Sequence, residues 1–399
     1  MRIITINKYR TFTVPSVMKS VFSNRFTLIL ITILSVLLIQ SCSSKQTSEP
    51  QKSNALSESE KLGKKIFFDA SLSSPAGQSC ASCHSPQHGF SHPDNKLATA
   101  EGALKGLFGN RNTPSIAYIG FTPKFHKTIE EGDLLYIGGF FLDGRETTLE
   151  DQATKPMLNP VEMGIKDEAT LVAIIKTRYE AEFNKVYGDG ALSNTAKAVN
   201  NISKAIADYE RSKEFSPFDS KYDAYLAGKT QLTEKELKGL KLFEAEDKGN
   251  CAACHPSTTD KETGFPPLFT DYTYDNLGVA VNESNPFLKN PVIYNPHGKN
   301  YSDNGLGEII KDKNQDGKFK VPTLRNIALT APYMHNGVLE NLTEVVKFYN
   351  TRDTNSNWGP AEIPTNVNKD ELGDLKLTDD EVEAIVAFLN TLTDGYNIN

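Results

Sequence analysis

The sequence predicts a mainly α-helical protein, made of two similar helical domains with long loops. The first observation is an internal repeat, because LSESEKLGKKIF (56–67) resembles LTEKELKGLKLF (232–243) position by position. The second is that each copy precedes a Cys-x-x-Cys-His motif, CASCH (80–84) and CAACH (251–255). The third is that further segments carry apolar residues at helical spacing, and no run of alternating strands stands out. The 399 residues suffice for both domains.

The N-terminus predicts an export signal that is not part of the fold. An apolar run at 26–39 follows basic residues and ends at Ser41-Cys42. This pattern is typical of a bacterial lipoprotein signal, so residues 1–42 are predicted to be a signal peptide with a lipoprotein cleavage box and Cys42 to carry the lipid. The alternative is a plain signal peptide. Residues 43–55 are polar and predict a flexible tether. We therefore expect export to the periplasm and attachment to a membrane through the lipid.

Both repeat copies predict a capped helix. Ser57 with Glu60, and Thr233 with Glu236, form a Ser/Thr-x-x-Glu capping box, in which each partner satisfies a free backbone N–H of the other. Each copy therefore reads as a capped helix followed by a loop and the Cys-x-x-Cys-His motif. This is the opening of a cytochrome c domain, present twice.

Helical spacing predicts three more helices, at 168–186, 194–211 and 379–392. Thr378 and Glu381 predict a capping box for the last one. Together with the repeat, these helices predict an N-terminal domain over 56–220 and a C-terminal domain over 221–395.

The cysteines indicate covalent haem. There are five, and after Cys42 the other four all lie in the two Cys-x-x-Cys-His motifs. A single motif of this kind is also compatible with a redox dithiol or half of a zinc site. Two copies in an exported chain favour one haem c in each domain. The thiols would bind the haem vinyl groups and each histidine one iron; these residues are Cys80, Cys83, His84, Cys251, Cys254 and His255.

The helix predicted to begin after Asn341 contains Tyr349, whose role has two possible interpretations. Asn341 can cap this helix with Glu344 three residues on, and Leu342, Val345, Val346 and Tyr349 recur along one face. Tyr349 is either part of a core stripe or an iron ligand through its phenol oxygen.

The charge balance argues against nucleic acid as a partner. The formal net charge is −7 at pH 7, and no long cluster of Lys and Arg is present.

Several motifs in order make the chain resemble the bacterial dihaem cytochrome c peroxidase superfamily, which includes the MauG-type enzymes. They are CASCH, RNTPS (111–115), FLDGRETTLEDQ (141–152), NPVEMG (159–164), YERSKEFSPFD (209–219), CAACH and FKVPTLRNIALTAPYMHNG (319–337). The resemblance implies that peroxide reacts at the N-terminal haem and that the C-terminal haem relays electrons. It implies a peroxide pocket with Gln152 and Glu162, in which the carboxyl moves the proton that peroxide cleavage requires. It also implies a calcium ion held by Asn112, Thr330 and Pro332.

Three departures from the family pattern bear on the subtype. No histidine lies where some members place a sixth ligand of the N-terminal haem, because His88 and His92 come too soon after His84. We therefore expect a five-coordinate N-terminal haem and exposed loop histidines. Tyr349 stands where the peroxidases have a methionine and the MauG-type enzymes a tyrosine; a phenolate favours oxidised iron. Leu142 stands where the superfamily usually has a tryptophan between the haems.

The favoured function is a peroxidase that reduces hydrogen peroxide to water with electrons from a small c-type cytochrome or a cupredoxin. The first alternative is a MauG-like oxidase that uses peroxide to oxidise a protein side chain or another organic substrate. The second is a non-catalytic dihaem electron-transfer cytochrome. The sequence is compatible with a homodimer and does not identify the donor.

Overall fold

The computed structural model describes residues 55–397, except 131 and 262. The chain divides into Met1–Ser53 and Asn54–Asn399, and all described residues belong to the second unit. The predicted signal peptide with Cys42, and the tether up to residue 54, lie outside the described residues. Within the described part of the chain, none of the helices has the length and apolar character that crossing a bilayer requires.

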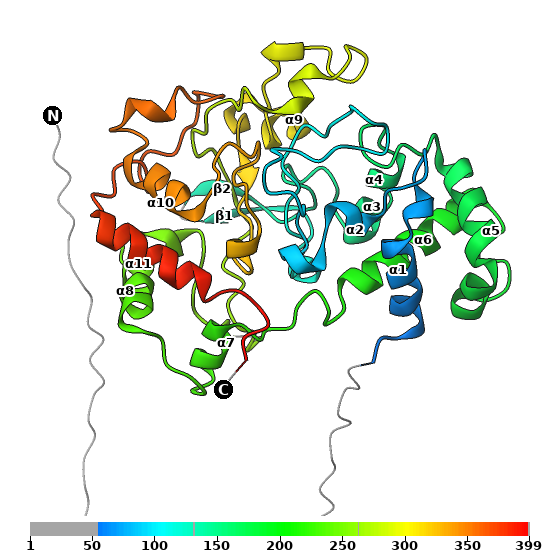
Figure 1. The fold of residues 1–399 in the computed structure, drawn as a ribbon, viewed down its shortest axis with the longest axis horizontal. Helices are drawn as coiled ribbons and strands as arrows, with labels where there is room; N and C mark the ends of the chain where they lie inside the picture. The colour runs from blue at the N-terminus through cyan, green and yellow to red at the C-terminus, as the bar shows by residue number, and fades with distance from the viewer. Residues whose placement is uncertain (1–54, 131, 262, 398–399) are drawn as a thin grey trace, which may run out of the picture. The chain divides into compact units, whose positions relative to one another are not determined.

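The described chain is rich in helices, as predicted, and long irregular segments connect them (Figure 1). The helices are α1 (Glu58–Phe68), α2 (Cys80–Cys83), α3 (Leu149–Ala153), α4 (Lys155–Leu158), α5 (Glu168–Tyr187), α6 (Thr195–Glu210), α7 (Lys221–Leu226), α8 (Glu234–Glu244), α9 (Leu306–Ile310), α10 (Leu342–Thr351) and α11 (Asp379–Asn390). The strands are β1 (His126–Glu130), β2 (Asp133–Ile137), β3 (Tyr274–Asp275) and β4 (Phe319–Lys320).

The four strands form two small antiparallel sheets that the sequence did not indicate. In the first, His126 pairs with Ile137 and Glu130 with Asp133. In the second, β3 pairs with β4. Most of β1 is exposed, so it lacks the alternation of buried and exposed positions by which a strand is recognised in a sequence. A pairing of two residues, as in β3 and β4, leaves no periodic pattern at all.

The predicted helices begin where their capping residues placed them. Ser57 and Glu60 form the capping box of α1, Thr233 and Glu236 that of α8, and Thr378 and Glu381 that of α11. Helices α5, α6 and α11 lie within two residues of the predicted ranges. These signals are local, which is why the sequence sufficed.

The repeat corresponds to two equivalent helix crossings, α1 with α6 and α8 with α11 (Figure 1). A methyl group at Gly63 would lie 1.9 Å from the carbonyl oxygen of Ala205, and one at Gly239 would lie 1.9 Å from that of Ala384. Only glycine lets the two backbones approach so closely. The duplication therefore preserves the crossing as well as the sequence.

Two main cores follow the chain order. One gathers buried side chains between Leu62 and Ile206, and the other gathers side chains between Tyr222 and Leu392. A third, aromatic cluster comprises Phe67, Phe90, Ala117, Tyr118, Tyr209 and Phe215. The boundary at 220/221 stays a prediction.

Candidate active site

His84 follows the short helix α2, which carries Cys80 and Cys83. Its Nδ1 lies 3.0 Å from the carbonyl oxygen of Phe90. A carbonyl only accepts, so Nδ1 carries the hydrogen and Nε2 is left as the ligand nitrogen. Burial lowers the pKa of His84 to about 4, which keeps the ring neutral. Phe90 has a positive φ of 57°, so the turn that presents this carbonyl is tightly specified.

His255 repeats this arrangement in the second half. Its Nδ1 donates to the carbonyl of Phe269 at 2.7 Å, and burial lowers its pKa to about 4. Phe269 also has a positive φ, of 55°. Both histidines are therefore neutral and oriented by a phenylalanine carbonyl, as iron-ligating imidazoles usually are.

A cavity of about 280 Å³ adjoins the second motif. Cys251, Cys254 and His255 line it on one side, and Tyr349 lines it as well. The remaining wall is mostly apolar, with leucines, valines and Phe243. An apolar cavity that presents two thiols and a neutral imidazole fits a covalently attached haem.

Tyr349 lies on α10 and faces this cavity. Burial raises the pKa of its phenol, and the neighbouring Cys254 and Cys251 raise it further, so the phenol lies close to both thiols. Leu342, Val345 and Val346 line the same cavity. The predicted core stripe is confirmed, because Leu342 and Val346 belong to the C-terminal hydrophobic core, and the same face of α10 lines the cavity.

The cap of α10 differs in one detail from the prediction. Asn341 accepts from the N–H of Glu344, as expected. The Glu344 carboxylate, however, accepts from the N–H of Glu340 at 2.7 Å and does not close a box with Asn341.

Two buried polar atoms near the first motif lack a hydrogen-bond partner among the described residues. Gln78 Oε1 and Glu210 Oε2 are buried, and neither has a hydrogen-bond partner among the described residues. Gln78 Nε2 lies 3.6 Å from Cys83 Sγ, and the charge of Glu210 acts on Cys80. Because buried polar atoms rarely stay unpaired, these orphans fit a site that holds a further group.

Glu162 is half-buried and acts electrostatically on this first motif. Burial raises the pKa of the Cys80 and Cys83 thiols, and the charge of Glu162 raises both further. Burial raises the pKa of Glu162 itself. Asn159 Nδ2 donates to Glu162 Oε1 at 2.7 Å and orients the carboxyl.

The loop that carries Glu162 is held by backbone hydrogen bonds. The carbonyl of Glu162 accepts from Ala103 N–H at 2.6 Å, and that of Met163 from Ser74 N–H at 2.8 Å. The carboxyl therefore belongs to a fixed loop next to the first motif.

Gln152 lies near the end of α3, and its side chain is half-buried. The structure describes no hydrogen bond between Gln152 and Glu162. The role of this pair stays a prediction.

The three predicted calcium ligands line one cavity wall. Asn112, Thr330 and Pro332 all border the cavity of the second motif, and the Asn112 side chain contacts the Pro332 carbonyl. In the described residues, no group of three or more His, Cys, Asp or Glu side chains is placed to hold a metal ion. The predicted site uses an amide and backbone carbonyls instead and stays a prediction.

His88 and His92 are half-buried, whereas exposed loop positions were expected. His88 Nδ1 lies 3.1 Å from Ser85 Oγ, and His92 Nδ1 accepts from Asp94 N–H at 3.1 Å. Ser85 and Ser91 pair with each other, so the chain that carries His88 folds back on itself after the motif.

The chain is similar to known proteins in sequence and in fold. A family model described as di-haem cytochrome c peroxidase matches residues 57–231. The methylamine utilization protein MauG of Paracoccus denitrificans is 38% identical over 356 residues, which cover 84% of this chain and 88% of MauG. The chain belongs to the di-haem cytochrome c peroxidase and MauG family.

Other members of this family include both kinds of enzyme. Cytochrome c551 peroxidase of Nitrosomonas europaea is 31% identical over 335 residues, covering 83% of this chain and 79% of that protein. The crystal structure of the diheme peroxidase BthA of Burkholderia thailandensis superposes with a TM-score of 0.75 at 32% identity, covering 84% of this chain and 86% of that one. The crystal structure of a MauG-like protein associated with microbial copper homeostasis superposes with a TM-score of 0.63 at 29% identity. The match covers 86% of this chain and 91% of that one.

Family membership makes this chain an oxidoreductase of the cytochrome c peroxidase and MauG type. It implies two haem groups, hydrogen peroxide as a substrate and a cytochrome as electron donor. The non-catalytic electron-transfer cytochrome is therefore disfavoured.

Three of the family motifs, RNTPS, FLDGRETTLEDQ and FKVPTLRNIALTAPYMHNG, meet in one buried network. Arg111 donates to both carboxylate oxygens of Asp303, at 2.6 and 2.7 Å, and to Asp143 at 2.7 Å. His335 Nε2 lies 3.0 Å from Glu362, whose other oxygen accepts from the N–H of Asp303. The signal was the charged residue inside each motif, but the sequence gives no means of pairing them.

The dihaem enzyme also buries a lysine that the sequence did not single out. Lys320 donates to the carbonyl of Gly139, and its backbone N–H to that of Leu142 at 2.8 Å. Burial lowers its pKa to about 7.

Proposed function

We propose that this protein is a dihaem cytochrome c peroxidase that reduces hydrogen peroxide to water. In the overall reaction one peroxide, two protons and two electrons give two waters. The electrons come from a small c-type cytochrome or a cupredoxin. A haem c attached to Cys80 and Cys83 and ligated by His84 supplies the iron at which peroxide reacts, and one on Cys251, Cys254 and His255 supplies the electron relay.

The observation that carries this proposal is the half-buried carboxyl of Glu162, which Asn159 orients and which raises the pKa of Cys80 and Cys83 in the first motif beyond the effect of their burial. Cleavage of the O–O bond needs a proton moved from one peroxide oxygen to the other. Burial raises the pKa of the Glu162 carboxyl, and a carboxyl held beside the reacting oxygens can both take and return that proton. Asn159 holds Glu162 in one orientation, and Gln152 is proposed to hydrogen-bond the peroxide.

Three further sites would support this reaction: a ligand of the second iron, a calcium site and a lipid anchor. Tyr349 would ligate the second iron from the cavity wall, and Asn112 with the carbonyls of Thr330 and Pro332 would bind calcium. A lipid on Cys42 would hold the exported enzyme at a membrane.

A MauG-like oxidation of a protein side chain or another organic substrate is the second candidate. It is supported by the 38% identity to MauG and by Tyr349 at the cavity. The peroxidase is supported by the similarity to BthA and to cytochrome c551 peroxidase.

The test is steady-state peroxide turnover with reduced cytochrome c as donor. Wild-type protein should turn over rapidly, and Glu162→Gln should lose about 10²–10⁴-fold, because the amide keeps the hydrogen bond to Asn159 but cannot move a proton. Glu101→Gln is the matched control. Its carboxylate accepts from Gly106 N–H in the loop that packs on Glu162, and we expect near wild-type turnover.

Inert wild-type protein would contradict the peroxidase. Peroxide-dependent oxidation of an organic substrate, without consumption of reduced cytochrome, would favour the MauG-like reaction. Unchanged turnover in Glu162→Gln would remove the role proposed for this carboxyl.

A further inference from the structure

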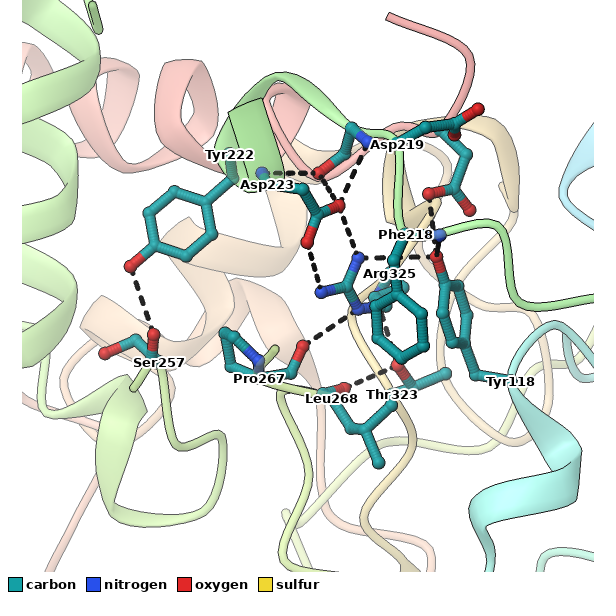
Figure 2. Close-up of polar contacts among 12 residues, drawn as sticks. Tyr118, Phe218, Asp219, Tyr222, Asp223, Ser257, Pro267, Leu268, Thr323 and Arg325 are labelled. Carbon is teal, nitrogen blue, oxygen red and sulfur yellow. Dashed lines mark hydrogen bonds and ion pairs between the residues drawn. The ribbon is translucent and has the colours of Figure 1, made fainter. Parts of the chain in front are cut away.

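Tyr118 lies where the two halves of the molecule meet. Its side chain is 2% exposed, and its ring packs on the guanidinium of Arg325 and on the ring of Phe218 (Figure 2). Its backbone has a positive φ of 59°, which is uncommon for an aromatic residue, and its N–H donates to the carbonyl of Phe215 at 2.8 Å. The surrounding structure therefore holds this side chain in one place.

The phenol of Tyr118 is hydrogen-bonded to a buried carboxylate. It donates to Asp394 Oδ1 at 2.7 Å, and Asn326 Nδ2 donates to Asp394 Oδ2 at 2.7 Å. The phenol oxygen also accepts from Phe218 N–H at 3.0 Å and from Arg325 Nη1 at 3.3 Å. Two donors would thus remain on this oxygen if its own hydrogen moved to Asp394. Burial raises the pKa of Asp394, which strengthens it as a proton acceptor.

This tyrosine connects the carbonyls that orient the two haem histidines. On one side, the Phe90 carbonyl accepts from His84 Nδ1 and from the N–H of Ile116, two residues before Tyr118. On the other side, Arg325 Nε donates to the carbonyl of Pro267 at 2.8 Å, in the segment that carries Phe269 (Figure 2). Hydrogen bonds and short covalent stretches thus lead from His84 through Tyr118 to His255.

We propose that Tyr118 and Asp394 form a proton-coupled redox site between the two haem-binding halves. The inference rests on the proposed peroxide reaction at the His84 haem, because peroxide oxidation of that haem supplies the oxidant. One electron leaves the Tyr118 phenol for the oxidised haem. The O–H bond breaks, its proton forms a bond to Asp394, and a neutral tyrosyl radical remains. One electron from the reduced His255 haem then converts the radical to phenolate, which takes back the proton from Asp394.

The proton acceptor is what makes the step feasible. Removing an electron from a phenol that keeps its proton would place a cation beside Arg325, which repels it. Transfer of the proton to Asp394 leaves a neutral ring and a neutral carboxyl, so no new charge is buried.

Tyr301 also contacts a buried carboxylate, that of Asp303, and accepts from Asn110 of the other half, but it has no described contact with the segments that orient His84 and His255. Tyr179 donates to Asp69 at 2.7 Å and Tyr209 to Glu214 at 2.8 Å, and both carboxylates belong to the N-terminal half. The single tryptophan, Trp358, donates to Thr351 and packs on Phe348 within the C-terminal core.

The test uses the full-length dihaem protein, mixed with one equivalent of hydrogen peroxide and frozen at successive times. Electron paramagnetic resonance should show an organic radical. Growth with ring-deuterated tyrosine should narrow its hyperfine splitting in otherwise unaltered protein, so this measurement does not depend on how a variant folds. Tyr118→Phe should abolish the signal, and Asp394→Asn should reduce its yield about tenfold or more, because the amide cannot accept the proton.

Tyr179→Phe is the matched control, since it removes a tyrosine with the same kind of carboxylate partner, and its signal should equal that of wild type. The haem absorption spectrum is recorded on the same samples. A haem that reacts with peroxide while the radical is absent, or insensitive to tyrosine deuteration, overturns this inference alone. A signal that persists in Tyr118→Phe and disappears in Tyr209→Phe overturns it as well. A haem that does not react with peroxide overturns both the inference and the proposed function.

Discussion

Arg325 and Asp223 form a buried, bidentate ion pair, with Nη1 and Nη2 of the arginine each 2.9 Å from one oxygen of the aspartate (Figure 2). The Arg325 side chain is 1% exposed and that of Asp223 is 8% exposed. Arg325 also donates to the Pro267 carbonyl, so one side chain joins α7 to the segment that carries Phe269. A charge so far from water depends on its partner.

Asp223→Asn should therefore destabilise the fold by about 3–5 kcal/mol, because it leaves the guanidinium buried without its counter-charge. Denaturant unfolding of both proteins measures the difference. The control is Glu383→Gln, which breaks the exposed pair with Lys235 and should change the free energy of unfolding by less than about 1 kcal/mol. Equal effects of the two variants would contradict the argument.

Gly239→Ala should destabilise the crossing of α8 with α11 by about 1–3 kcal/mol or more, although alanine favours a helix over glycine. The added methyl would lie 1.9 Å from the Ala384 carbonyl oxygen and 2.9 Å from Phe388 Cβ. At Gly109 the nearest atoms lie 4.0 Å away, so Gly109→Ala is the control and should be nearly neutral. The melting temperatures of both variants, compared with that of wild type, measure the two effects. A harmless Gly239→Ala would mean that the helices separate without cost.

Tyr349→Phe should alter the absorption and the paramagnetic spectrum of the second haem, because it removes the proposed phenolate ligand. Tyr349→Met should raise the reduction potential of that haem, since a thioether favours the reduced iron. Tyr333→Phe is the control, because Tyr333 lines the same cavity but donates to the Ile327 carbonyl at 2.8 Å. Spectra of Tyr349→Phe that match wild type would make Tyr349 only a part of the cavity wall.

Stability should fall as the pH rises from about 5 to about 8, partly because of Glu210. Burial raises its pKa from 4.5 to about 8, so the folded protein keeps a proton that the unfolded chain releases in this range. The free energy of unfolding therefore falls with rising pH. The slope is about 1.4 kcal/mol per pH unit between the two pKa values, which gives several kcal/mol in all.

Glu210→Gln should remove this dependence, because the amide does not ionise. Melting temperatures of wild type and variant across the range provide the measurement. Glu383→Gln, at an exposed position, should keep the wild-type slope. Parallel slopes for wild type and Glu210→Gln would show that the carboxyl is ionised in the fold.

The helix starts were predictable because a cap is a contact between residues three apart. Thr233 and Glu236, for example, form their capping box independently of how the rest of the chain folds. The strand β1 was missed because its exposed residues carry no alternation. The Glu344 carboxylate accepts from the N–H of Glu340, one residue before the predicted partner Asn341.

For the candidate site, the sequence by itself determined the chemistry that each half carries: two cysteines and a histidine, preceded by the same capped helix with its glycine. These features are local, so the order of residues suffices to read them. Only the tertiary structure decided what surrounds them. The Phe90 and Phe269 carbonyls orient the two histidines, and Tyr118 reaches Asp394 across 276 positions of the chain. Such contacts depend on how irregular segments pack against one another, and no periodicity along the chain records that packing.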